Sequence, residues 1–95
     1  MISVTGPLWL WTSENGSWHF ITVPEELSDP IKAHCLAELR GFKSARVEAR
    51  IGEVSWRTSI FPIKSGGYIL PVKKEVRCRA AIAAGDEVTV EIDLL

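Results

Sequence analysis

Four side chains that suit the binding of an anion fall in two short segments of the sequence. Thr58 and Ser59 supply hydroxyl groups within "WRTSIFP", and Lys73 and Arg77 supply positive charges within "LPVKKEVR". Hydroxyls and cations together bind carboxylates and phosphates through charge-assisted hydrogen bonds. The four residues form one site only if the strand that begins at Val54 runs beside the start of the second helix. The competing interpretation, which the sequence favours, is that the helix cations pair with acidic side chains of the last strand.

An aromatic group on the first predicted hairpin is the second candidate feature, for a partner or a ligand groove. It comprises Trp9, Trp11, Trp18 and Phe20. Each such side chain carries about 150 to 250 Å2 of surface, and soluble monomers seldom expose a contiguous apolar area of several hundred Å2. Three arrangements would cover it: the helix that begins near Pro30 together with the core, a second copy in a homodimer, or a ligand in a groove. The sequence favours cover by the helix and the core.

The other reactive side chains form no catalytic arrangement. Cys78 lies between two arginines, but successive residues of a helix point in different directions, so this proximity in sequence is weak support for a reactive thiolate. Cys35 is expected to be an inert core thiol, and His34 beside it faces elsewhere, so no Cys-His pair is expected. His19 is expected at the surface opposite Thr12. No metal-ligand spacing, phosphate loop or nucleophile elbow occurs, so we predict no catalytic residue, no metal and no cofactor.

Composition and charge narrow the class of protein. The 95 residues show neither a repeat nor a shift of composition, so residues 1–95 are expected to form one domain with one core. Apolar runs are far shorter than the roughly 20 residues that cross a bilayer, and the start lacks a basic region followed by an apolar block. A soluble cytoplasmic protein without membrane contact is therefore expected. The 11 basic residues are offset by 12 acidic ones, which disfavours nucleic-acid binding, because that draws on Lys and Arg meeting phosphates.

The first predicted elements are a hairpin and a helix. Asn15-Gly16 suits a type I′ turn between strands, and pairing outward from it places Trp11 opposite Phe20 and Trp9 opposite Thr22, with an aliphatic opposite face. Asp29 is expected to cap the following helix, with Pro30 at its first position. The helix is expected to end at Gly41. Its narrow apolar stripe, which should lie on the sheet, is Ile31, Cys35 and Leu39, with Leu36 at the margin.

A second hairpin and a second helix follow. Gly52 is predicted to supply the turn of the hairpin. The expected pairs are Val47 with Thr58, Ala49 with Trp56, Ile51 with Val54, and Glu48 with Arg57. A short helix from about Lys73 to Ala81 is expected to turn Val72, Val76, Ala80 and Ala83 inward.

The last strand alternates strictly. Val88, Val90, Ile92 and Leu94 face one way, while Glu87, Thr89, Glu91 and Asp93 face the other. We interpret the acidic row as the solvated face of an outer strand. The expected order is β-β-α-β-β-β-α-β, and Gly6-Pro7 is a signal that divides the first strand in two. Short antiparallel strands with few free edges predict a mainly β fold, a small closed or partly open barrel of six or seven strands with two short helices.

Several segments, in the same order, resemble a bacterial family catalogued as domain of unknown function nineteen-oh-five. They are "FITVP" at 20–24, "WRTSIFP" at 56–62, "LPVK" at 70–73, "VR" at 76–77 and "GDEV" at 85–88. The resemblance runs nearly end to end and implies a small barrel, found alone or beside a bacteriocin-protection type of segment, with no agreed reaction or ligand. A shorter likeness, "LP-x-K" followed by "GD-x-V-x-V", is similar to swapped-hairpin transcription factors, in which Lys or Arg near such a helix meets DNA.

Three functions follow from these observations. The first is a non-enzymatic module that binds a small anion or a protein at the aromatic hairpin or at the Lys73/Arg77 end of the barrel. The second is a dimeric nucleic-acid binder of the swapped-hairpin type, against which the overall charge argues. The third is a small enzyme, which would need an accessible pocket containing Arg77 with a titrating partner. The sequence leaves the ligand and the oligomeric state, homodimer included, open.

Overall fold

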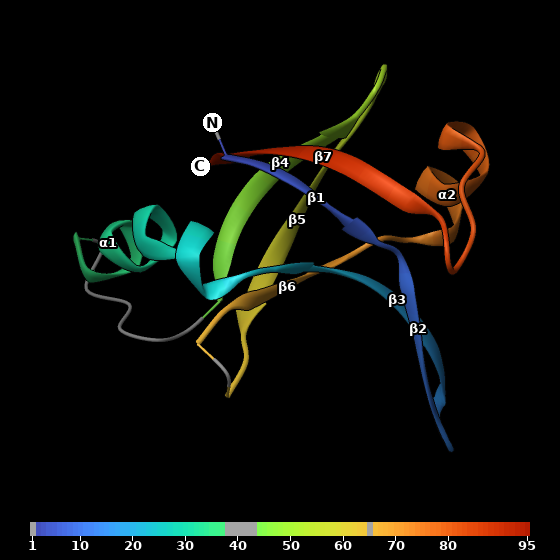
Figure 1. Ribbon diagram of the computed structural model, residues 1–95, viewed down its shortest axis with the longest axis horizontal. Helices are drawn as coiled ribbons and strands as arrows, with labels where there is room; N and C mark the ends of the chain where they lie inside the picture. Colours follow the sequence, from blue (N-terminus) through green and yellow to red (C-terminus); the bar gives the residue numbers. More distant parts are fainter. Residues whose placement is uncertain (1, 38–43, 65) are drawn as a thin grey trace.

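The computed structural model describes residues 2–37, 44–64 and 66–95, and the chain is mainly antiparallel β-structure (Figure 1). The strands are β1 (Ile2–Pro7), β2 (Trp9–Ser13), β3 (Gly16–Val23), β4 (Ala45–Ile51), β5 (Val54–Pro62), β6 (Tyr68–Pro71) and β7 (Glu87–Leu94). The helical elements are the 3-10 turn η1 (Glu25–Leu27), α1 (Asp29–Ala37) and α2 (Lys74–Ala80). The predicted order is confirmed, and the first strand is divided at Leu8, next to the Gly6-Pro7 signal.

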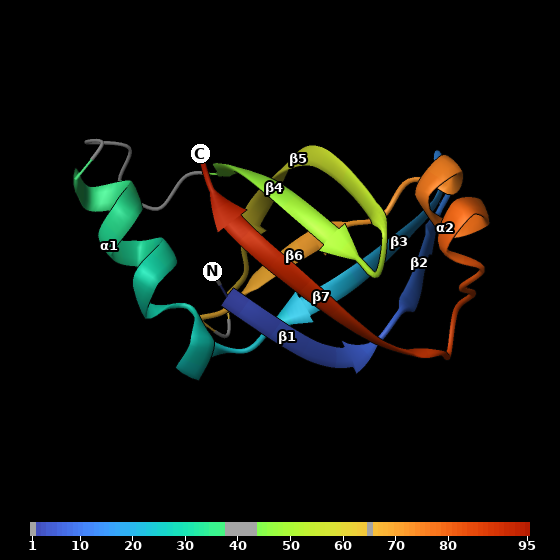
Figure 2. The same ribbon diagram turned by 90° about the horizontal axis from the view of Figure 1, so that it is seen from above.

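The strands form a sheet in the order β1-β7-β4-β5-β6-β3-β2, which curls into a half-barrel with α1 and α2 at opposite ends (Figure 2). The two edge strands, β1 and β2, are consecutive in the sequence and meet at the fully buried Leu8. The N–H of Leu8 donates to the carbonyl of Asp86 at 2.9 Å, and its carbonyl accepts from the N–H of Gly85 at 2.7 Å. The predicted small barrel is therefore confirmed in its partly open form.

The β2–β3 hairpin has the predicted faces but not the predicted register. Its two-residue turn begins one residue earlier than expected, and Gly16, with a φ of 127°, is the first residue of β3. Asn15 is not left-handed, so the type I′ turn does not form. The Ser13 hydroxyl accepts the N–H of Asn15 at 3.3 Å and donates to the carbonyl of Gly16 at 3.4 Å, which stabilises the earlier turn. Trp11 consequently faces Trp18, two residues from its predicted partner, and this even shift preserves both faces.

The β4–β5 hairpin confirms the sequence prediction in register and turn. Gly52 has a φ of 59°. The predicted pairs are all present: Val47 with Thr58, Ala49 with Trp56, Ile51 with Val54, and Glu48 with Arg57. The Nε of Arg57 lies 3.6 Å from Oε2 of Glu48, but both side chains are well exposed. An exposed pair of this kind contributes at most about 1 kcal/mol, so its main effect is on register.

The first helix, α1, starts slightly earlier than predicted. It includes Asp29, which was expected as its cap, because the N–H of Lys32 donates to the carbonyl of Ser28 at 2.9 Å and closes the first turn there. Ile31 is fully buried, as its stripe position predicts. The other stripe residues, Cys35, Leu36 and Leu39, and the expected end at Gly41 lie outside the described side chains. α1 lies at one end of the half-barrel (Figure 2).

The second helix, α2, is one residue shorter at each end than predicted. Val72 and Val76 are buried and Ala80 is half-buried, as expected. Ala83 was expected inward but is exposed, because Ala81 adopts the left-handed conformation with a φ of 56° and ends the helix before it. Among the described residues, no helix has both the length and the apolar character needed to cross a membrane.

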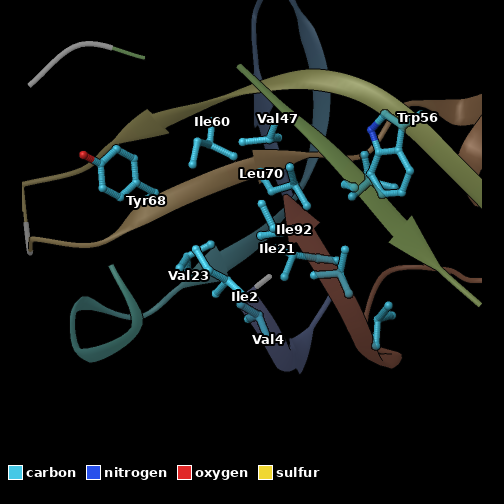
Figure 3. Close-up of a cluster of buried hydrophobic side chains, with 14 of the residues drawn as sticks. Ile2, Val4, Ile21, Val23, Val47, Trp56, Ile60, Tyr68, Leu70 and Ile92 are labelled. Atoms are coloured by element: carbon cyan, nitrogen blue, oxygen red, sulfur yellow. The ribbon is translucent and has the colours of Figure 1, made fainter. Parts of the chain in front are cut away.

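The closing strand, β7, is an interior strand of the sheet, next to the edge strand β1. It pairs with β1 on one side and with β4 on the other, so the acidic row belongs to an interior strand and not to the outer strand predicted. Its apolar residues Val88, Val90 and Ile92 are buried as expected. They join a core built from the inward faces of all the long strands, with Tyr68 at one end of the cluster and Trp56 at the other (Figure 3).

Candidate functional site

A groove opens where β5 separates from β6. Strand β5 pairs with β4 from Val54 to Ile60, but its described pairing with β6 is limited to Phe61 and Pro62. The first part of β5 therefore leaves its edge toward β6 uncovered, and α2 packs against β5 there. The resulting groove, which we call the cationic groove, has a volume of about 630 Å3. This volume lies within the range of about 300 to 1,000 Å3 that is common for ligand sites.

All four residues predicted for an anion site line the cationic groove. Thr58 and Ser59, both half-buried, come from β5, while the exposed Lys73 precedes α2 and the half-buried Arg77 lies one turn into it. Nη1 of Arg77 donates to the carbonyl of Val72 at 2.7 Å, so the guanidinium is held at the start of the helix. The adjacency that the anion hypothesis required, β5 beside the beginning of α2, is present.

Further lining residues come from elements that sequence reasoning did not bring together. They are Ser17, Trp18 and His19 of β3, Arg46 of β4, Trp56, Arg57 and Phe61 of β5, and Pro71, Val72 and Lys74 before and within α2. With Arg46, Arg57, Lys73, Lys74 and Arg77, the groove gathers five cationic side chains, and no carboxylate is among its described lining residues. The chain as a whole carries a net charge of −1. The positive charge is thus a local feature of the fold.

Among the described residues, no ion pair joins an α2 cation to the last strand, so the neutralisation that the sequence favoured is not found there. The Glu91 carboxylate pairs with Nη2 of Arg50 on β4, at 2.6 Å. The Asp86 carboxylate accepts the N–H of Ala83 at 2.8 Å. Glu91 is thus engaged with the neighbouring strand β4, and Asp86 with the loop before β7. Within the described chain, the ion pair found for the α2 end is the loose one, 4.0 Å, between Lys73 and Glu75.

His19 is a titratable side chain of the groove that was expected merely at the surface. It pairs with Leu10 rather than with Thr12, because of the register shift, and lies half-buried among the groove residues. Its carbonyl accepts the N–H of Val72 at 2.9 Å, which fixes β3 beside the start of α2. Burial, and then the positive charge of Arg77, lower the pKa of His19 below its ordinary value of 6.5. Both causes disfavour the imidazolium.

Trp56 lines the groove and also carries a buried hydrogen-bond donor. The residue is only 7% exposed, and its ring lies at one end of the core cluster (Figure 3). Among the described residues, its indole Nε1 is fully buried and has no hydrogen-bond partner. Leaving such a donor unsatisfied costs about 1 to 3 kcal/mol. A ligand or water oxygen that reached this N–H would recover that cost.

The aromatic face of the first hairpin is not covered as predicted. Trp11 is 49% and Trp18 is 53% exposed, so neither the helix nor the core shields them. α1 lies at the opposite end of the half-barrel from this hairpin (Figure 2). Trp9 and Phe20 are half-buried, with ring centroids 5.1 Å apart, and Nε1 of Trp9 donates to Oγ1 of Thr22 at 2.8 Å.

The remaining candidates stay outside the groove. Cys78 is exposed on α2 and does not line the groove. Nε2 of His34 donates to the backbone oxygen of Leu95 at 3.0 Å, which ties α1 to the end of β7. The expected core position of Cys35 lies outside the described side chains. Within the described part of the chain, no group of His, Cys, Asp and Glu side chains has the geometry of a metal site.

Comparison with known proteins gives a family and no activity. The family described as Domain of unknown function (DUF1905) matches residues 5–92 of the chain, which confirms the resemblance seen in the sequence. Three of the segments that carry this resemblance, 56–62, 70–73 and 76–77, contribute to the lining of the cationic groove. No curated protein matches the chain.

Proposed function

Since the chain belongs to the DUF1905 family, and the family's description names no activity, we propose from the groove alone that this domain is a non-enzymatic module that binds a small anion. The observation that carries this proposal is the grouping of Lys73 and Arg77 with the hydroxyls of Thr58 and Ser59 in a groove without a described carboxylate. An anionic carboxylate or phosphate suits such a site, because its oxygens accept charge-assisted hydrogen bonds from the cations and ordinary ones from the hydroxyls.

The state of the cations supports this proposal. Within the described chain, Arg77 has no carboxylate partner, and its hydrogen bond to the carbonyl of Val72 leaves guanidinium N–H groups available for a ligand. The Lys73 ammonium lies 4.0 Å from Glu75, and both side chains are largely exposed, so that contact gives little stabilisation. Bringing several positive charges together costs free energy in the empty groove, because the exposed pairs of Arg57 with Glu48 and Lys73 with Glu75 offset it only weakly. A bound anion would remove this repulsion.

A titration of the protein with phosphate, sulfate and acetate at low ionic strength tests the proposal. We expect each multivalent anion to raise the melting temperature and to shift the amide signals of residues 56–59 and 73–77 in 1H–15N NMR spectra. The double variant Lys73→Gln/Arg77→Gln should raise the phosphate Kd at least about tenfold, because charged hydrogen bonds contribute about 1.5 to 3 kcal/mol each.

The matched control is Lys64→Gln/Arg79→Gln, which removes the same charge from side chains that do not line the groove. Its phosphate Kd should stay within about twofold of that of the parent protein. If no anion bound, or if both double variants weakened binding equally, the groove would not be an anion site.

A small enzyme is the second candidate, and one observation favours it. The groove is accessible and contains Arg77 together with a titrating partner, His19, which is the arrangement that the enzyme hypothesis required. A neutral imidazole beside a bound phosphate ester would be placed to transfer a proton. Release of inorganic phosphate from an aryl phosphate, lost in His19→Gln, would establish this function in place of simple binding.

A further inference from the structure

A second, shallower depression adjoins the cationic groove. It has a volume of about 240 Å3 and is lined by the aromatic patch, which we define as Trp11, Trp18, Phe20, Phe61, Ile69 and Pro71. Three members of this patch, Trp18, Phe61 and Pro71, line the cationic groove as well. The two depressions are therefore one continuous surface that is positively charged at one end and apolar at the other.

The aromatic patch presents flat rings to solvent. Trp18, Trp11 and Phe61 are 53%, 49% and 44% exposed. The rings of Trp18 and Phe20 are nearly parallel, with an interplanar angle of 9° and centroids 6.4 Å apart. Exposed aromatic area of this kind is unfavourable in water and favours occupancy by an apolar group. A flat apolar ring fits it best, because aromatic rings pack in offset-stacked or edge-to-face geometry.

We infer that the ligand of this domain is a small aromatic anion, whose phosphate or carboxylate lies at Lys73 and Arg77 and whose ring lies on Trp18. This inference rests on the proposed anion-binding function and names the class of ligand. Trp18 is the connecting residue, because it faces both depressions.

Charge favours this ligand over two other possible occupants of the aromatic patch, a second copy of the chain and a nucleic acid. In a two-fold homodimer, each partner offers the same surface, so a dimer through the aromatic patch would bring two cationic grooves together, and like charges would oppose it. A long nucleic acid would extend past the groove onto a chain whose net charge is −1. A small anion needs only the local charge of the groove, whose described lining contains five cationic side chains and no carboxylate.

Three probes separate the two parts of the site: inorganic phosphate for the anion, 1-naphthol for the ring, and 1-naphthyl phosphate for both. The chain has four tryptophans, so its indole N–H signals in NMR spectra report each ring after assignment with single Trp→Phe variants. We expect 1-naphthyl phosphate to bind at least about fivefold more tightly than phosphate, since stacking of one ring on an aromatic side chain strengthens binding by this factor or more. It should move the Trp18 and Trp56 signals, whereas phosphate should leave Trp18 unmoved.

The variant Trp18→Ala should reduce the advantage of 1-naphthyl phosphate over phosphate, measured in the same variant, to less than about threefold. Leu10→Ala is the matched control, because Leu10 is a similarly exposed apolar residue, 47% exposed, on the opposite face of the same hairpin. It should leave all three affinities unchanged. Trp18 is on the surface, so its loss should not prevent folding, and coincident melting curves of the variants verify this.

The outcomes distinguish the inference from the function on which it rests. If phosphate binds and 1-naphthyl phosphate binds no more tightly, or if Trp18→Ala keeps the full advantage, the aromatic inference is overturned and the anion site stands. If 1-naphthol binds as tightly as 1-naphthyl phosphate and phosphate does not bind, the anion-binding function is overturned. Binding of a single-stranded oligonucleotide without binding of 1-naphthyl phosphate would overturn the inference in favour of a nucleic acid.

Discussion

At the scale of single residues, His19 links the groove to pH. Its pKa lies below 6.5 because the ring is partly desolvated and because Arg77 is near. An anion at Arg77 would act in the opposite direction, since a negative charge favours the imidazolium. Anion binding and protonation of His19 should therefore support each other, and each should raise the affinity for the other.

The resulting prediction is that sulfate binds more tightly at pH 5.5 than at pH 7.5. Sulfate keeps its charge over this range, so the change reports on the protein. As the pH falls from 6.5 toward the lowered pKa of His19 in the free protein, His19 takes up a proton more readily in the sulfate complex than in the free protein. The affinity for sulfate therefore rises. Isothermal titration calorimetry in two buffers of different ionisation enthalpy measures both the Kd and the proton uptake. His19→Gln should flatten the pH dependence, and an equally steep dependence in that variant would exclude His19 as its cause.

The stability of the empty protein should depend on pH in the opposite direction. The unfolded chain binds the His19 proton more readily than the folded chain, because the folded pKa is the lower one. The free energy of unfolding therefore has its full His19 contribution above the ordinary pKa and loses it as the pH falls through the lowered pKa. Acid should weaken the empty protein and strengthen the complex, a contrast that a lone surface histidine would not produce.

At the scale of elements, the two hairpins show what local sequence can decide. In the β4–β5 hairpin, the alternation of apolar residues and Gly52 agree on one register, and the structure has that register. In the β2–β3 hairpin, a turn at Asn15-Gly16 competes with a turn one residue earlier that the hydrogen bonds of the Ser13 hydroxyl stabilise. The earlier turn is the one that forms. Two turn signals one residue apart cannot be ranked from the sequence, because both preserve the faces of the strands.

The site was predictable only in part, for reasons that also lie at this scale. Thr58, Ser59, Lys73 and Arg77 could be proposed together because hydroxyls and cations of suitable chemistry lie in two segments. The roles of His19 and Trp56 could not be predicted from the sequence. The position of His19 depends on the register of β2–β3, and the role of Trp56 depends on its buried N–H having no partner among the described residues. The groove itself depends on where β5 leaves β6, a long-range feature of the sheet.

The close contact of the β6 loop with the end of β3 gives a second prediction. A Cβ at Gly67 would lie 2.3 Å from the carbonyl oxygen of Val23, a backbone atom that cannot move away alone. Gly67→Ala should therefore lower the free energy of unfolding by about 2 to 3 kcal/mol, as overpacking does. Gly52→Ala is the comparison: Gly52 has a φ of 59° and open space around it, so only the left-handed conformation is penalised, by about 1 kcal/mol.

Urea unfolding followed by circular dichroism measures both variants. The order of the two losses is the test, since it separates a steric clash from backbone strain. A Gly67→Ala protein as stable as Gly52→Ala would mean that β6 can move away from β3, and the β3–β6 pairing next to the groove would then be looser than the structure indicates.

At the scale of the whole molecule, net charge is a poor guide to binding. The value of −1 correctly describes the average over the chain and disfavours nucleic acid as a class of partner. The fold nevertheless gathers cations from β4, β5 and α2 at one groove, while Glu91 of β7 pairs with Arg50 of β4, which does not line the groove. A local site of this kind follows from the topology, which places β7 between β1 and β4.

The same topology makes one buried side chain the junction of the half-barrel. Leu8 joins the two edge strands of the sheet, is 0% exposed, and uses both of its backbone hydrogen-bonding groups to hold the segment before β7. Leu8→Ala should lower the free energy of unfolding by about 2 to 5 kcal/mol, the usual cost of a cavity left by a fully buried leucine. Leu10→Ala, two residues along the chain at an exposed position, should cost at most about 0.5 kcal/mol.

Urea unfolding of both variants, followed by tryptophan fluorescence and by far-UV circular dichroism, measures the losses. Because Leu8 connects both ends of the sheet, the two signals should change together and the slope of the free energy with urea should equal that of the parent protein. If the fluorescence of the Trp-rich β2–β3 hairpin were lost before the circular dichroism signal in Leu8→Ala, the hairpin would be an independent unit. The edge strands would then not depend on each other through Leu8, and the half-barrel would be held by its pairings alone.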